Sequence, residues 1–239
     1  MIQTKVFNNK NEVAKAFADF IVQLTKHRTK VHIALSGGST PKVLFDLLAS
    51  NYRTQINWKV IHFWWGDERC VPPDSSDSNY NMTHQHLLQH IDISESQVHR
   101  VLGEADPQQE AQRYGDHMHR ELSKIHEVPV FDLIILGMGS DGHTASIFPH
   151  QMDLLREENI CAVATHPESG QQRITITGHV INQARHIAFL VTGNDKAEKV
   201  ETIINKKPGY HKYPAAHVAP ITGKLTWYLD HEAAAGLET

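Results

Sequence analysis

Residues 131–143 read FDLIILGMGSDGH, an apolar run followed at once by a turn rich in glycine. A short aliphatic run that ends in glycines is typical of a strand buried inside a parallel sheet. The turn carries two proton-handling side chains, Asp141 and His143, on either side of Gly142. Open α/β sheets hold their chemistry at the carboxyl ends of their strands, so we expect this turn in a functional site. A solvated turn explains the segment alone equally well.

The glycines of this turn also fit the pattern G-x-G-x-x-G of dinucleotide-binding folds. That pattern is weak by itself, and its third glycine, Gly142, is flanked here by Asp141 and His143. An acidic residue that would bind the ribose is not evident at the expected spacing after Leu136. An NAD-dependent dehydrogenase therefore stays only as an alternative.

Short apolar runs alternate with helical patterns on both sides of this segment. We expect helices over residues 12–27, from 41, 79–91, 107–125 and 195–205, and strands over 31–35, 60–65, 131–136, 160–164, 173–177, 187–192 and 225–229. This alternation predicts βαβ units and a parallel sheet. We expect the last residues, from Ala233 onward, to form a frayed helix end or tail.

The composition is that of an ordinary globular protein. With 239 residues, 40% of them hydrophobic, the chain can form one large or two small domains. A formal charge of −4 and the lack of a dense basic run argue against nucleic-acid binding. No signal-like start or membrane-length apolar run is present, so we expect a cytoplasmic protein with no membrane partner.

Neither the cysteines nor the histidines indicate a metal site. Cys70 and Cys161 do not form a C-x-x-C motif, which argues against a disulfide framework or a thiolate zinc site. The 18 histidines include His86 and His90 one helical turn apart, but no H-E-x-x-H motif occurs. We expect no metal.

The segment SGGSTP at 36–41 follows the strand expected at 31–35. We expect Thr40 to be the N-cap and Pro41 the first residue of a helix. Free backbone N–H groups, hydroxyls and the helix dipole favour an anion there, and phosphate is the natural ligand. A capped helix without a ligand is the alternative. The residues of this phosphate loop are Gly37, Gly38, Ser39 and Thr40.

Other charged residues also follow or begin expected strands. Lys196 lies in the first turn of a helix, where a cation opposes the dipole, which suggests an anion nearby. Arg173 begins a strand and can bind phosphate with two hydrogen bonds. Asp67 and Arg69 follow the strand at 60–65 and are expected on the same rim as His143. Taken alone, Lys196 and Arg173 are each explained better by a solvated surface charge than by a ligand contact.

Several motifs in a fixed order then identify a family resemblance. They are SGGSTP at 36–41, GDER at 66–69, VP at 71–72, SN at 78–79, GMGSDGHTASIFP at 137–149, RIT at 173–175, Gly193 with Lys196, and PAA at 214–216. In these motifs, over roughly residues 30 to 222, the chain resembles the 6-phosphogluconolactonases of the glucosamine-6-phosphate isomerase/6-phosphogluconolactonase family.

The resemblance implies hydrolysis of 6-phospho-D-glucono-1,5-lactone to 6-phosphogluconate in the pentose phosphate pathway, with no cofactor and no metal. It also implies a doubly wound, mostly parallel α/β sheet with helices on both faces, shared with glucosamine-6-phosphate deaminase. We therefore expect a single domain over residues 1–239 and a monomer or weak dimer whose partner is the small sugar-phosphate lactone.

The family's site residues carry over position by position. His143 matches the general base, Asp141 its neighbour, and Arg69 a residue that helps bind or stabilise the lactone end. Asp67 is assigned to the same catalytic end, and the division of roles among these neighbours stays open. The positions that match the phosphate site are Arg173, Lys196, Gly37, Gly38, Ser39 and Thr40.

Two further readings compete with lactone hydrolysis. In the deaminase and isomerase branch a carboxylate precedes the proline after Asp-Gly-His, and Asp67 would abstract a proton next to the carbonyl carbon. This chain has Phe148 before Pro149, and Arg69 where that branch usually has an aromatic residue. A catalytically silent sugar-phosphate sensor is disfavoured by the intact His143 and by the absence of an appended DNA-binding motif.

Overall fold

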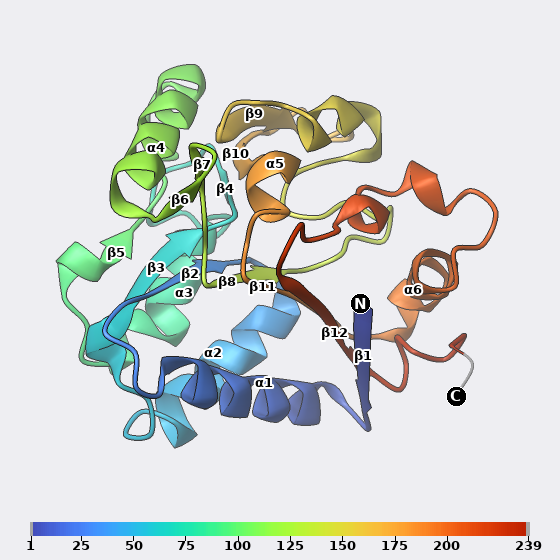
Figure 1. Ribbon diagram of the computed structural model, residues 1–239, viewed down its shortest axis with the longest axis horizontal. Coiled ribbons are helices and arrows are strands. Elements are labelled where there is room, and N and C mark those ends of the chain that lie inside the picture. Colours follow the sequence, from blue (N-terminus) through green and yellow to red (C-terminus); the bar gives the residue numbers. More distant parts are fainter. Residues whose placement is uncertain (1, 238–239) are drawn as a thin grey trace.

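The computed structural model describes residues 2–237, which form a seven-stranded parallel sheet between layers of helices (Figure 1). Every pair of neighbouring strands in this sheet is parallel. In spatial order the strands are β1 (Ile2–Phe7), β12 (Lys224–Asp230), β11 (His186–Val191), β8 (Leu133–Leu136), β2 (Val31–Leu35), β3 (Ile61–Trp65) and β5 (Val98–His99). The predicted doubly wound, mostly parallel fold is confirmed.

Helices cover both faces of the sheet. They are α1 (Lys10–Thr25), α2 (Ser39–Asn51), α3 (Asn79–His86), α4 (Pro107–Glu121), α5 (Gly178–Ile181) and α6 (Ala197–Ile204). Figure 1 shows α1 and α2 along one face and α4 and α5 along the other. α1 begins where the Asn9 side chain accepts hydrogen bonds from the backbone N–H groups of Asn11 and Glu12, and it buries one apolar stripe against the sheet.

A small antiparallel sheet lies on the α4 side of the main sheet. It pairs β4 (Asp67–Arg69), β10 (Gln172–Ile176) and β9 (Cys161–Thr165). A further two-stranded hairpin joins β6 (Lys124–Ile125) to β7 (Val128–Pro129). The strands predicted near 160–164 and 173–177 are therefore present, but they belong to this separate sheet.

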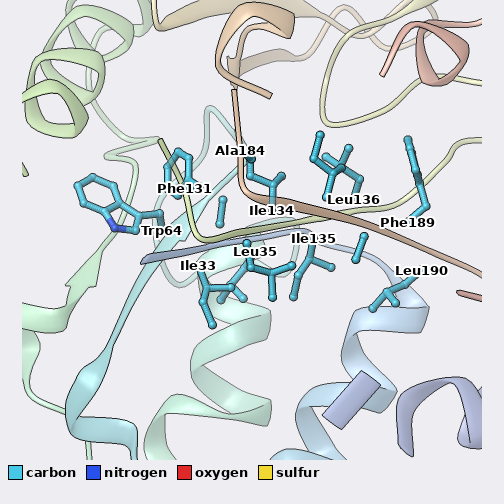
Figure 2. Close-up of a cluster of buried hydrophobic side chains, with 14 of the residues drawn as sticks. Ile33, Leu35, Trp64, Phe131, Ile134, Ile135, Leu136, Ala184, Phe189 and Leu190 are labelled. Atoms are coloured by element: carbon cyan, nitrogen blue, oxygen red, sulfur yellow. The ribbon is translucent and has the colours of Figure 1, made fainter. Parts of the chain in front are cut away.

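The central strands β2 and β8 are buried on both faces. Figure 2 shows Ile134 and Leu136 on one face of the sheet and Ile135 on the other, as the alternation along a strand requires. Burying each such side chain contributes about 1.5–3 kcal/mol. The strand order reverses between β2 and β8, so the loops after these two strands diverge and leave a crevice at their carboxyl ends.

Several predicted boundaries were wrong. The helix expected from Pro107 to Ile125 ends at Glu121, and the helix expected to reach Ile91 ends at His86, followed by a 3-10 turn, Leu88–His90. The helix expected over 195–205 is a 3-10 turn, Asn194–Lys196, followed by α6. β1 was not predicted.

The chain end also differs from the expectation of a frayed helix end or tail. Residues 231–237 form turns, in which Ala233 and Ala234 are buried. Residues 238–239 lie outside the described part of the chain. Within residues 2–237, no helix combines the length and apolar character that a membrane span requires.

Candidate active site

A cleft of about 190 Å³ opens at the carboxyl ends of β2, β3 and β8. It lies where the strand order reverses, the usual ligand position in such sheets. Its lining residues are Ser36, Gly37, Gly38, Asp67, Arg69, Asn79, Gly137, Met138, Gly139, His143, Ala145 and Arg173. Six of the predicted site residues are thus brought together: Gly37, Gly38, Asp67, Arg69, His143 and Arg173.

Asp141 is hydrogen-bonded to His143 at the edge of the cleft. Nδ1 of His143 lies 2.6 Å from Oδ1 of Asp141, and the backbone N–H of His143 donates to the same oxygen at 3.1 Å. Burial acts to raise the pKa of Asp141, but the hydrogen bonds and charge of His143 outweigh it and lower the pKa to about 2. The ionised Asp141 carboxylate can accept a hydrogen bond from the N–H at Nδ1 of His143. In that tautomer the other ring nitrogen, Nε2, has a free lone pair and can take a proton.

The turn that holds this pair depends on glycine. Gly142 has a φ of +82°, and a side chain there would also collide with the ring of Tyr213. A side chain at Gly139 would collide with the imidazole of His143 and the carboxylate of Asp141. The glycines thus let the backbone of the turn pack closely against the His143–Asp141 pair and Tyr213. In the described part of the chain, no helix packs on them as in a dinucleotide-binding loop.

Two arginines on neighbouring strands line the same cleft. Arg69 on β4 is directly opposite Arg173 on β10 in the antiparallel register. The Nε atoms of both guanidinium groups are buried and have no hydrogen-bond partner among residues 2–237. Burial, and then the charge of Arg69, lower the pKa of Arg173. Arg69 is only partly buried, and its Nη1 donates to the carbonyl oxygen of Asp77 at 2.6 Å. Two neighbouring guanidinium groups, each with an Nε–H that donates to no described residue, form a site for an anion.

Phe148 packs against both His143 and Arg173. Its ring is fully buried, with its centroid 4.7 Å from that of His143 and 5.5 Å from the guanidinium carbon of Arg173. The contact with Arg173 lies within the range of a cation–π interaction. Phe148 therefore supports both groups without adding charge to the site.

Glu68 and Asn79 complete the wall next to β4, and the motif analysis gave neither a role. The buried Glu68 carboxylate accepts hydrogen bonds from the backbone N–H groups of Arg69, Asn79 and Tyr80, which ties β4 to the start of α3. The Asn79 side chain donates to the carbonyl oxygen of Asp67 at 2.9 Å. Both residues lie in motifs that carry the family resemblance, GDER at 66–69 and SN at 78–79.

The phosphate loop is only partly as predicted. Gly38, with a φ of +108°, is the N-cap of α2, so Thr40 and Pro41 lie inside the helix and the predicted cap was wrong. Ser39 is exposed, and the Thr40 hydroxyl is 2.7 Å from that of Thr192, at the end of β11. Neither lines the cleft, but this contact holds the segment after β11 against the start of α2.

Lys196 lies on that neighbouring segment and is not among the residues that line the cleft. Its Nζ is 2.9 Å from a carboxylate oxygen of Asp195. The position of Lys196 against the helix dipole had suggested an anion nearby. In the structure, Asp195 provides one.

Within residues 2–237, no three histidine, cysteine or carboxylate side chains are arranged to hold a metal ion. His86, one of the two histidines considered for a metal, contacts the Asp46 carboxylate at 2.6 Å. The cleft contains a histidine bonded to a carboxylate and, in the same lining, two arginines.

Comparisons with known proteins indicate one family. The sequence profile of the glucosamine-6-phosphate isomerases/6-phosphogluconolactonase family matches residues 8–227. The chain is 50% identical to a 6-phosphogluconolactonase of Haemophilus influenzae over 204 residues, which cover 85% of this chain and 86% of that protein.

Solved structures give the same result. The 6-phosphogluconolactonase of Trypanosoma brucei superposes with a TM-score of 0.88 at 32% identity and covers 100% of this chain and 99% of that one. A monomeric glucosamine-6-phosphate deaminase has a TM-score of 0.84 at 20% identity, covers 98% of this chain and 99% of its own, and shares the fold alone. From the profile, the sequence identity and the site, the chain belongs to the glucosamine-6-phosphate isomerase/6-phosphogluconolactonase family.

Proposed function

We propose that this protein hydrolyses 6-phospho-D-glucono-1,5-lactone to 6-phospho-D-gluconate, the second step of the oxidative pentose phosphate pathway. The observation that carries the proposal is that His143, which is bonded to Asp141, lines the same cleft as Arg69 and Arg173. The curated relative at 50% identity bears the same activity in its name. The reaction opens an ester bond with water and needs no change of oxidation state.

His143 is the proposed general base. With Nδ1 bonded to Asp141, its Nε2 takes a proton from a water as that water attacks the lactone carbonyl. Asp141 fixes the ring orientation and stabilises the imidazolium that forms. The proton then passes from His143 to the ring oxygen as the C1–O bond breaks, so the base is restored in each turnover.

The arginines supply the positive charge that both ends of the substrate require. Arg69 is proposed to stabilise the oxygen of the lactone carbonyl as negative charge develops on it. Arg173 is proposed to bind the phosphate, together with the N–H groups of the loop from Gly37 to Thr40 and with Lys196. The contact between Thr40 and Thr192 supports the inclusion of Lys196, because this contact holds the segment that carries Lys196 beside the phosphate loop. A bound phosphate orients the ring so that C1 meets the attacking water.

We also propose that the protein works in the cytoplasm as a monomer or weak dimer. Cys70 and Cys161 are both free, as a reducing compartment requires, and burial raises the pKa of the Cys161 thiol, which keeps it unreactive.

A direct assay separates this function from its alternatives. The purified protein is expected to accelerate lactone hydrolysis, followed by pH-stat titration and corrected for spontaneous ring opening. Ammonia release from glucosamine 6-phosphate is measured in parallel and is expected to be absent. Ammonia release at a rate comparable with lactone hydrolysis would assign the chain to the deaminase branch. If the protein shows neither activity, the sugar-phosphate sensor is the remaining alternative.

A further inference from the structure

A buried hydroxyl lies between the Asp67 carboxylate and the Arg173 guanidinium group, two of the charged groups that line the cleft. Ser146, three residues after His143, is fully buried. Its Oγ donates a hydrogen bond to Oδ2 of Asp67 at 2.6 Å. The same oxygen lies 3.5 Å from Nη1 of Arg173, at the outer limit of a hydrogen bond. Ser146 therefore stands between a buried carboxylate and a buried guanidinium.

The backbone holds this hydroxyl in place. The backbone N–H of Ser146 donates to the Thr175 hydroxyl at 3.2 Å, and Thr175 is directly opposite Asp67 in the register of β10 and β4. The loop that carries His143 is thus joined to both strands of the antiparallel pair. Asp67 and Arg173 are only 6% and 9% exposed, so water competes little with these contacts.

From this arrangement we propose that Ser146 is a positioning residue, which acts with Asp67 to orient Arg173 for the phosphate of the substrate. The proposal rests on the function stated above and adds a role that the motif analysis did not assign. The hydroxyl has one proton, which it donates in the hydrogen bond to Asp67, so its lone pairs are available to accept from Arg173. The contact with Ser146 occupies Nη1 of Arg173, whereas Nε is buried and unpartnered among the described residues.

The same arrangement gives Asp67 a different part from the one it would have in an isomerase. There it would remove a proton from carbon. Here its Oδ2 accepts a short hydrogen bond from Ser146, and its negative charge offsets the two adjacent arginines. Asp67 is therefore a fixed countercharge in this proposal, and proton transfer belongs to His143.

The test begins with Ser146→Ala. Loss of a hydrogen bond to charged groups should raise KM for the phosphorylated lactone about tenfold or more, while kcat stays within about threefold, because the proton-transfer pair is untouched. The matched control is Thr177→Val, which removes another fully buried hydroxyl from the end of β10. This control should leave KM within about twofold.

A double-mutant cycle with Arg173→Ala shows whether Ser146 acts through Arg173. In the Arg173→Ala background, Ser146→Ala should change KM by less than about twofold. Full additivity of the two effects would overturn the proposal. A fall in kcat of about 100-fold at unchanged KM would also overturn it, because that is the result for a proton-transfer group.

Phosphate binding provides a readout that does not depend on turnover. Calorimetry with inorganic phosphate should show about tenfold weaker binding to Ser146→Ala than to the wild type and to Thr177→Val. Equal affinities would contradict the proposal even if the wild type proved to hydrolyse no lactone. If Ser146→Ala does not fold, Ser146→Cys fills the same space with a weak donor and is expected to give the same loss.

Discussion

The phenyl ring of Phe148 packs against the imidazole of His143, with a distance of 4.7 Å between the ring centroids. This position, just before Pro149, is where the deaminase and isomerase branch is expected to carry a carboxylate. A fully buried phenyl ring there leaves Asp141 as the carboxylate bonded to His143. The contact therefore favours an activated water over proton movement between carbon atoms.

Phe148→Glu should reduce lactone hydrolysis without creating deaminase activity. A carboxylate at this place would compete with the substrate for Arg173, and its charge would oppose the negative charge that builds on the lactone oxygen. We expect kcat/KM to fall by about tenfold or more. Phe148→Leu, which keeps the position apolar, is the control. A gain of lactonase activity in the glutamate variant would contradict this explanation.

His143→Ala should remove most of the catalytic rate and leave the affinity for 6-phosphogluconate nearly unchanged. General-base catalysis contributes on the order of 10² to 10⁴-fold, and kcat should fall by that factor. Asp141→Asn should also lower kcat, because an amide cannot stabilise an imidazolium as an ionised carboxylate does. Steady-state kinetics and product binding separate the two effects. Normal turnover in a correctly folded His143→Ala would eliminate the proposed base.

The sequence predicted the regions whose structure is set locally and missed those that depend on distant pairing. β2 and β8 are short apolar runs followed by glycines, and both were predicted within two residues of their observed ends. β4, by contrast, consists of the charged residues Asp67–Arg69, which carry no apolar pattern, and it exists because it pairs with β10.

The candidate site shows the same division. His143 and Asp141 are neighbours in the sequence, so a motif was sufficient to find them. Ser146 is near His143 in the sequence, but its partner Asp67 is 79 positions away. Contacts formed only by tertiary folding were beyond the sequence.

Arg173→Ala should weaken use of the phosphorylated lactone far more than use of the unphosphorylated lactone. A lost hydrogen bond to a charged group costs about 1.5–3 kcal/mol, which is roughly a 10- to 150-fold loss in kcat/KM. Lys196→Ala should act in the same direction. Its effect should be smaller, because Lys196 is already paired with Asp195 and does not line the cleft. Equal losses on both lactones would remove these residues from the phosphate site.

Removal of metal ions should not affect activity. The proposed mechanism uses His143 to activate water and Arg69 to stabilise the oxyanion, so it includes no step that requires a metal. Exhaustive dialysis against EDTA is therefore expected to leave the rate of lactone hydrolysis unchanged. An inactive dialysed enzyme that recovers on addition of zinc or calcium would contradict the mechanism.

A cluster of neutral histidines lies away from the cleft, beside Trp64. His32 lies opposite His62 in the register of β2 and β3, Nδ1 of His62 is 3.0 Å from Nε2 of His99, and the ring of His99 stacks on Trp64 at 4.0 Å. Burial, followed by the charges of neighbouring groups, lowers the pKa of both His32 and His99 to about 3. The folded protein therefore excludes protons that the unfolded chain accepts.

This cluster should make the fold acid-sensitive. Each of the two histidines has a pKa near 6.5 in the unfolded chain and about 3 in the folded protein. The contribution of these two histidines to the free energy of unfolding is thus complete above pH 6.5. It declines as the pH falls toward 3, by up to about 1.4 kcal/mol per pH unit for each histidine. Urea unfolding at pH 7.5 and pH 5 measures the decline.

His99→Phe keeps the stacking on Trp64 but cannot titrate, so its stability should fall less between the two pH values. The exposed His84, changed to phenylalanine, is the control and should retain the wild-type slope. An unchanged slope in His99→Phe would assign the acid sensitivity to other groups.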